Sequence, residues 1–177
     1  MTIETLRADF PDYARDTKIN LSKILAEDSL SGLTLPQAHG IALAAAYATK
    51  QKAIIDAVVA ETQSVLDEAM VVAAKAAATI MGMNNVYYRF VHLVNDKEYG
   101  TMPANLRMNI IGNPGIAKVD FELMSLAVSA LNGCGMCMDA HVHEVIKAGV
   151  SKQAIQHTIR IAAVLSAAAQ CVVIEGL

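Results

Sequence analysis

Apolar residues recur at helical spacing along almost the whole chain, and this pattern sets the fold class. Runs rich in Ala, Leu, Met and Ile dominate, whereas alternating stretches of β-branched residues are scarce. The patterns predict helices over 13–26, 34–50, 51–62, 63–82, 84–94, 120–131, 134–148 and 152–174, with an irregular region over 95–115. The chain has 177 residues, enough for one sizeable core. We therefore expect an all-α fold with a single domain over residues 1–177.

Two segments of the chain resemble each other weakly. Residues 68–89 and 122–143 share a Glu, a Met and some Ala positions at corresponding places. Both an internal duplication and chance similarity between Ala-rich helices explain this likeness, and the two explanations stay open. In either case, only the second segment carries cysteines.

The composition limits the partners and the environment of the chain. Hydrophobic residues make up 54% of the sequence and charged residues only 18%, so we expect surplus apolar helix surface to be buried in an oligomer. The net charge of −3 and the lack of a basic stripe argue against a nucleic-acid partner. The longest apolar stretch, Ile161 to Ile174, has 14 residues, too few to cross a bilayer. Because no N-terminal secretory signal is seen, we expect no membrane association and a cytoplasmic location.

A pair of cysteines follows the helix-breaking pair Asn132-Gly133, and residues 134–141 read Cys-Gly-Met-Cys-Met-Asp-Ala-His. On a helix of 3.6 residues per turn, Cys134, Cys137 and His141 fall within about 60° of one another. The partial positive charge of a helix N-terminus stabilises a thiolate, the reactive form of cysteine. The spacing lets the thiols form a disulfide, and a histidine exchanges protons near neutral pH. The motif therefore predicts a redox-active dithiol at the start of a helix.

Glu122 is the predicted fourth member of this site. It lies ten residues before Asn132. If Asn132-Gly133 reverses the chain into an antiparallel helical hairpin, Glu122 comes level with His141. A carboxylate in that position orients an imidazole and stabilises its charged form. The spacing thus predicts a contact between Glu122 and His141.

Three segments together resemble one protein family. They are residues 121–141 with the cysteine motif, residues 81–89 (Met-Gly-Met-Asn-Asn-Val-Tyr-Tyr-Arg) and residues 106–115, which end in Ile-Gly-Asn-Pro-Gly. Over nearly its full length, the chain resembles the alkyl hydroperoxidase AhpD family, which is part of the carboxymuconolactone decarboxylase-like superfamily. This resemblance implies an AhpD-like helical fold with the CxxC at a helix N-terminus, assembled as a homotrimer.

The resemblance also implies roles and partners. Cys137 is implied as the cysteine that a peroxide oxidises to a sulfenic acid, and Cys134 as the residue that supplies a proton and then closes the Cys134–Cys137 disulfide. Glu122 and His141 are implied to serve the proton relay. The implied substrates are organic hydroperoxides, with no bound cofactor, an AhpC-type peroxiredoxin as partner and a dihydrolipoyl group on a lipoyl-bearing protein as electron donor. Because a protein-sized partner must reach a sulfur, we expect an exposed edge at the motif.

One residue departs from the family pattern. Met136 stands between the cysteines, where that pattern has a histidine, and a methionine cannot shuttle protons. On an ideal helix, Met136 points away from the face of Cys134 and His141, so we expect the dithiol to be unaffected. The departure favours disulfide exchange over direct peroxide reduction.

Two other functions stay open. A lactone decarboxylase belongs to the same superfamily and uses no dithiol, whereas a non-catalytic module would use the cysteines to hold a metal. A closed zinc site needs four ligands, and this motif supplies three, so we predict no metal. Cys171 is expected to be buried in its apolar helix, and His143 to lie on the opposite face from Cys134.

Overall fold

The computed structural model describes residues 1–177 and contains helices but no strand, which confirms the all-α prediction. The α-helices are α1 (Ile3–Ala8), α2 (Arg15–Leu21), α3 (Leu35–Thr49), α4 (Lys52–Thr62), α5 (Glu68–Leu93), α6 (Asn109–Gly112), α7 (Lys118–Leu131), α8 (Gly135–Lys147) and α9 (Lys152–Glu175). Three short 3₁₀ helices accompany them: η1 (Asp12–Ala14), η2 (Glu27–Ser29) and η3 (Lys97–Gly100).

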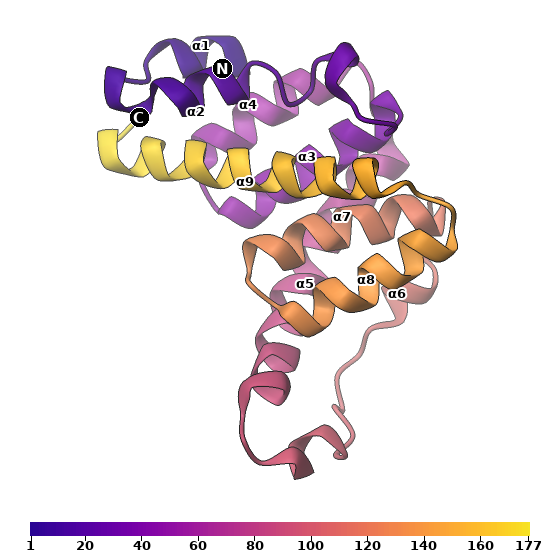
Figure 1. Cartoon of the computed structure of the whole chain (residues 1–177). Coiled ribbons are helices and arrows are strands. Elements are labelled where there is room, and N and C mark those ends of the chain that lie inside the picture. The colour runs from indigo at the N-terminus through magenta and orange to yellow at the C-terminus, as the bar shows by residue number, and fades with distance from the viewer.

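Helix α3 forms the centre of the core because its side chains are small. Every residue from 38 to 46 is buried, and five of these nine are alanines. Small residues let neighbouring helices approach closely, and a Cβ atom built on Gly40 would lie only 2.5 Å from Met124 Cε on α7. Helix α3 packs against α4, α5, α7 and α9, and α9 runs across the body (Figure 1).

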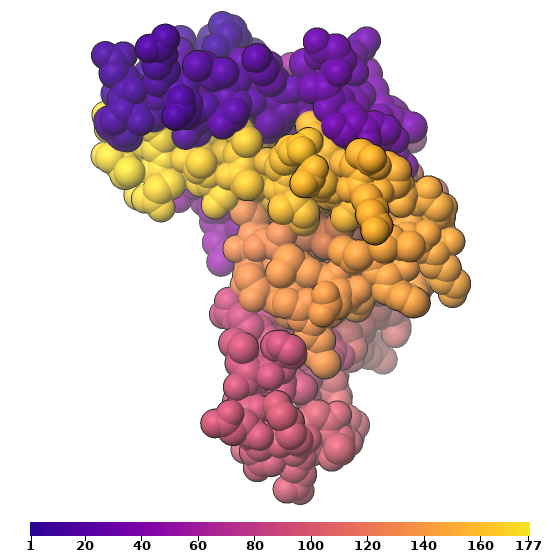
Figure 2. Space-filling model, viewed as in Figure 1, coloured from indigo at the N-terminus to yellow at the C-terminus, as the bar shows by residue number.

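The C-terminal end of α5 leaves the body and begins an arm. The arm comprises the end of α5, η3 and the irregular chain that returns to α6, and it projects clearly in Figures 1 and 2. The predicted helix end at Gly82 is wrong, because α5 continues without a break to Leu93. A glycine inside a helix costs only about 1 kcal/mol relative to alanine, so helix-forming residues on both sides carry the helix through it.

The two segments that resemble each other have different structures. Residues 68–89 lie within the single helix α5, whereas residues 122–143 form a hairpin of α7 and α8. The break in the second segment falls at Asn132 and Gly133, and the first segment has no glycine or asparagine at the corresponding two places.

Two helices, α5 and α9, are each long and apolar enough to cross a bilayer by length and composition. The expectation that no apolar stretch of this chain is long enough to cross a bilayer is therefore wrong. Core helices of folded proteins meet the same test, and half of the apolar window of α9 is buried inside the fold. The two helices give only weak support for a membrane span.

Candidate active site

A tight turn brings the two cysteines to the start of α8. Asn132 caps α7, and Gly133 adopts the left-handed backbone conformation (φ +68°) in which the chain reverses. Cys134 is the N-cap of α8, and its Sγ atom accepts a hydrogen bond from the Cys137 N–H (3.3 Å). A disulfide joins Cys134 and Cys137, whose Cα atoms are 5.3 Å apart. The prediction of a cysteine pair at a helix start is confirmed.

The hairpin of α7 and α8 also brings Glu122 and His141 together. The His141 Nδ1 atom lies 2.6 Å from Glu122 Oε2, and both side chains are buried. An ionised carboxylate only accepts hydrogen bonds, so the Nδ1 atom of His141 carries a hydrogen and donates a hydrogen bond to Glu122. The other ring nitrogen, Nε2, lies 3.3 Å from Met81 Sδ on α5. The predicted contact is therefore present, whereas the role of the pair in proton transfer stays a prediction.

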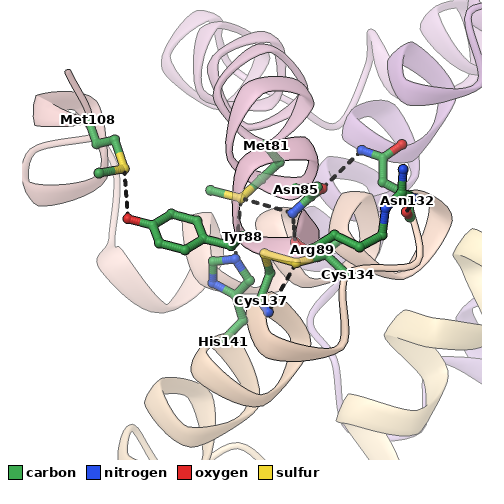
Figure 3. The surroundings of a disulfide bond; sticks show 10 residues. Met81, Asn85, Tyr88, Arg89, Met108, Asn132, Cys134, Cys137 and His141 are labelled. Atoms are coloured by element: carbon green, nitrogen blue, oxygen red, sulfur yellow. Dashed lines mark hydrogen bonds between the residues drawn. A yellow bond between two sulfur atoms is a disulfide. The ribbon is translucent and has the colours of Figure 1, made fainter. Parts of the chain in front are cut away.

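A polar network on one side of the disulfide holds this turn in place (Figure 3). Met81, Asn85 and Arg89 are four residues apart and share one face of α5. The Asn85 amide donates to Ser129 Oγ (2.9 Å) and accepts from the Asn132 amide (2.9 Å). Arg89 donates to the main-chain carbonyl of Asn132 (2.7 Å). The turn before the first cysteine is thus fixed from α5.

The other side of the disulfide faces a cavity of about 420 Å³. Cys137 lines this cavity and keeps 7% of its surface exposed, whereas Cys134 is fully buried. Glu122 and His141 line the same cavity. Any molecule that enters the cavity therefore meets one sulfur together with the carboxylate–imidazole pair.

Apolar side chains from several elements complete the cavity. Met81 and Tyr88 come from α5, and Met108 and Ile111 come from the chain that returns along the arm. The Tyr88 hydroxyl points to Met108 Sδ (3.9 Å), which links the two parts of the wall (Figure 3). A wall of thioether, aromatic and aliphatic groups suits a ligand with an apolar body.

The motif keeps an exposed edge at the cavity, where Met136 is exposed and Cys137 retains 7% of its surface, whereas Cys134 is covered. One expectation about the motif is wrong. Met136 does not point away from the site but lines the same cavity as Cys137 and His141, with 41% of its surface exposed. The cavity spans a wide face of α8 that includes Ala140, one turn after Met136.

Several residues of the site were not predicted from the sequence. Met81, Asn84 and Tyr88 line the cavity, and Asn85 anchors the turn. The usable signal was the pair of adjacent amides inside an otherwise apolar helix. Both Asn84 and Asn85 are buried, and buried amides require hydrogen-bond partners.

Other candidate residues lie apart from the site. Cys171 is buried and His143 is exposed, as expected. His157 is buried near the N-terminal elements, where its Nε2–H donates to the Ile24 carbonyl (3.0 Å) and burial lowers its pKa. No group of three or more His, Cys, Asp or Glu side chains is arranged to hold a metal ion.

Known proteins resemble this chain over nearly its full length. The model of the carboxymuconolactone decarboxylase family matches residues 97–173. An alkyl hydroperoxide reductase AhpD of Coxiella burnetii is 57% identical over 174 residues, which are 98% of this chain and 98% of that protein. An alkyl hydroperoxide reductase AhpD of Brucella suis is 51% identical over 169 residues, 96% of this chain and 95% of that protein. The chain therefore belongs to the AhpD family, within the carboxymuconolactone decarboxylase-like proteins.

Proposed function

We propose that this protein reduces alkyl hydroperoxides by cycling Cys134 and Cys137 between dithiol and disulfide. The observation that carries the proposal is a disulfide with one sulfur facing an apolar cavity that also contains the Glu122–His141 pair. The relatives' names, alkyl hydroperoxide reductase, point to the same chemistry.

The proposed reaction follows from the positions of the sulfurs. Cys137 gives its thiol proton to His141, and the thiolate attacks the terminal oxygen of the hydroperoxide, so that an S–O bond forms and the O–O bond breaks. The released alkoxide takes a proton from His141, whose charged form Glu122 stabilises. Cys134 then attacks the Cys137 sulfenic acid, forming the disulfide and releasing hydroxide, which leaves as water once protonated. One hydroperoxide and two thiols thus yield one alcohol, one water and one disulfide.

The shape of the site supports a slender electron donor. Cys137 is reached through the cavity and Cys134 is buried, so a flat protein surface cannot touch either sulfur. A dihydrolipoyl group at the end of a flexible lysine side chain is narrow, apolar and carries two thiols. We propose such a group, on a lipoyl-bearing protein, as the external reductant, with an AhpC-type peroxiredoxin as the partner that passes electrons to peroxide. That partner must offer its sulfur on a flexible segment.

We also propose a homotrimer, for which exposed apolar side chains support assembly and the resemblance to the AhpD family supplies the number of subunits. Large apolar side chains are exposed on the arm and beside its base: Val86, Phe90, Leu93, Tyr99, Met102 and Ile110. A patch of this kind marks a surface that another protein covers. Light scattering on the purified protein should give three times the chain mass of 18.8 kDa, and Leu93→Glu should lower it. A wild-type protein that stays monomeric contradicts this assembly.

The location follows from the same chemistry. A dithiol that must be reduced again in every cycle needs a reducing compartment. We therefore propose that the protein acts in the cytoplasm.

One experiment tests the proposed reaction directly. The reduced protein is mixed with excess cumene hydroperoxide, and free thiols and cumyl alcohol are measured with time. We expect two thiols lost for each alcohol formed, and recovery of both thiols when dihydrolipoamide is added. Thiols that persist in the presence of peroxide contradict the proposal.

The two alternative functions have their own tests. A lactone decarboxylase activity would survive in Cys134→Ser, because that chemistry needs no dithiol. A metal-binding module would retain stoichiometric metal after purification, and elemental analysis detects it.

A further inference from the structure

The carboxamide of Asn84 is a buried polar group without a partner at the wall of the cavity. Asn84 lies on α5 and is only 5% exposed. It lines the same cavity as Cys137 and His141, and its Oδ1 atom has no hydrogen-bond partner in the protein. The neighbouring Asn85, in contrast, uses both ends of its amide in the network that anchors the turn.

The position of Asn84 on the helix explains this difference. Residues 81, 84 and 88 lie three and four positions apart, so they share one face of α5, and all three line the cavity. Asn85 is turned by about 100° from Asn84 and faces the end of α7 instead. The two adjacent amides therefore serve opposite sides of the disulfide.

An unpaired amide in this place is costly. A buried polar atom without a hydrogen bond costs about 1–3 kcal/mol, and native proteins contain few such atoms. Three side chains of this protein carry one, Asn84, Ser125 and His157, and among them Asn84 alone lines the cavity that contains Cys137. An orphaned group in the wall of the cavity that Cys137 also lines points to a ligand as the missing partner.

We infer that Asn84 binds the peroxide group of the substrate. This inference rests on the proposed function. A hydroperoxide has one O–H donor and two acceptor oxygens, and a carboxamide offers the matching acceptor and donor. The Asn84 Oδ1 atom has almost no accessible surface in this structure, so this side chain must move as the peroxide enters. Its oxygen then accepts the O–H of the terminal oxygen, and its amide N–H donates to the oxygen that carries the alkyl group.

These contacts assist the step at Cys137. When the thiolate forms the S–O bond and the O–O bond breaks, negative charge collects on the alkyl-bearing oxygen. The Asn84 N–H stabilises this charge until His141 delivers the proton, as donors do in other sites where an oxyanion develops. Asn84 thereby aligns the O–O bond with Cys137 without taking part in electron transfer.

Asn84→Leu tests the inference, because leucine has nearly the same shape and lacks both polar atoms. We expect the second-order rate of thiol oxidation by cumene hydroperoxide to fall about tenfold, which corresponds to about 1.4 kcal/mol. Reduction of the disulfide by dihydrolipoamide should change far less, because that step contains no peroxide group. The unfolding free energy should be unchanged or higher, since the orphaned amide is gone.

Ser125→Ala is the matched control. Ser125 also has an orphaned buried oxygen, but it does not line the cavity, so this variant should keep the wild-type rate with cumene hydroperoxide. An Asn84→Leu protein that is as fast as wild type overturns the inference alone. Equal losses in the peroxide and lipoamide steps, together with lower stability, also overturn it, because they indicate a structural role. A wild-type protein whose thiols do not react with peroxide overturns both the proposed function and this inference.

Discussion

The two sides of the Cys134–Cys137 disulfide differ in how their polar groups are satisfied. On the side of Cys134, Asn85 and Arg89 bond to the turn, and the sulfur is fully buried. On the side of Cys137, Asn84 is unpaired and the sulfur faces a cavity of about 420 Å³. The paired side keeps the geometry fixed, and the unpaired side leaves room and hydrogen-bonding capacity for a reacting molecule.

Helix α5 produces both sides at once. One of its faces presents residues 85 and 89 to the turn between α7 and α8, and the next face presents residues 84 and 88 to the cavity. Met81 lies between the two, since its sulfur contacts His141 (3.3 Å) and also the Asn85 amide (3.9 Å). Two adjacent faces of the same helix therefore serve different purposes: one supports the turn, and the other lines the cavity.

The largest expected effect comes from replacing each of the two cysteines in turn by serine. Cys137→Ser should slow the reaction with cumene hydroperoxide at least about a thousandfold, because the sulfur in the cavity is lost. Cys134→Ser should still react once and stop at the sulfenic acid on Cys137, which dimedone traps for mass spectrometry. A sulfenic acid that forms on Cys134 in Cys137→Ser at a comparable rate would reverse the assignment of the two sides.

The next largest effect concerns the carboxylate–imidazole pair. Glu122→Gln keeps the size of the side chain but removes the charge that stabilises protonated His141. We expect the rate of thiol oxidation to fall about a hundredfold, the usual contribution of general acid–base catalysis. Circular dichroism serves to check that the variant is folded, and a rate within threefold of wild type would exclude the pair from proton transfer.

A third prediction addresses the paired side. Asn85→Ala removes the partners of Ser129 and Asn132 and should lower the unfolding free energy by about 2 kcal/mol in urea titrations. Asn84→Leu, one residue away, should not lower it. If both variants lose stability to the same extent, the contrast between the two sides is wrong.

The smallest effect is a pH dependence that arises far from both sides. Burial lowers the pKa of His157 below its usual value of 6.5, so the unfolded chain binds this proton more readily than the folded one. Stability should therefore be full above pH 6.5 and should decrease slightly as the pH falls below it. His157→Gln should flatten this part of the stability curve, and an unchanged slope would assign the effect to another group.

Much of the fold and of the reacting group can be predicted from local rules. Helical periodicity and the Asn132-Gly133 break define the α7–α8 hairpin, and counting residues from the break places Glu122 opposite His141. These predictions succeed because they involve residues close in sequence, whose separation is fixed by helix geometry.

The cavity and its orphaned amide depend on tertiary packing. The contacts between α5 and α8 join residues 60 positions apart, such as Met81 and His141, and no local pattern determines them. The same packing explains one failure, since the cavity wall extends around α8 to Met136, which was expected to point away from the site. The prediction that a helix ends at Gly82 is wrong because the helix-forming residues on both sides of Gly82 outweigh the small free-energy cost of one glycine.

The most direct test of the difference between the two sides measures the two thiols separately. The reduced wild-type protein is treated with a limiting amount of iodoacetamide, and the alkylated cysteines are identified by mass spectrometry of peptides as a function of time. If the cavity is the route to the site, Cys137 is modified at least about tenfold faster than Cys134, because Cys137 keeps 7% of its surface accessible and Cys134 keeps none. Equal rates, or faster alkylation of Cys134, would contradict the account.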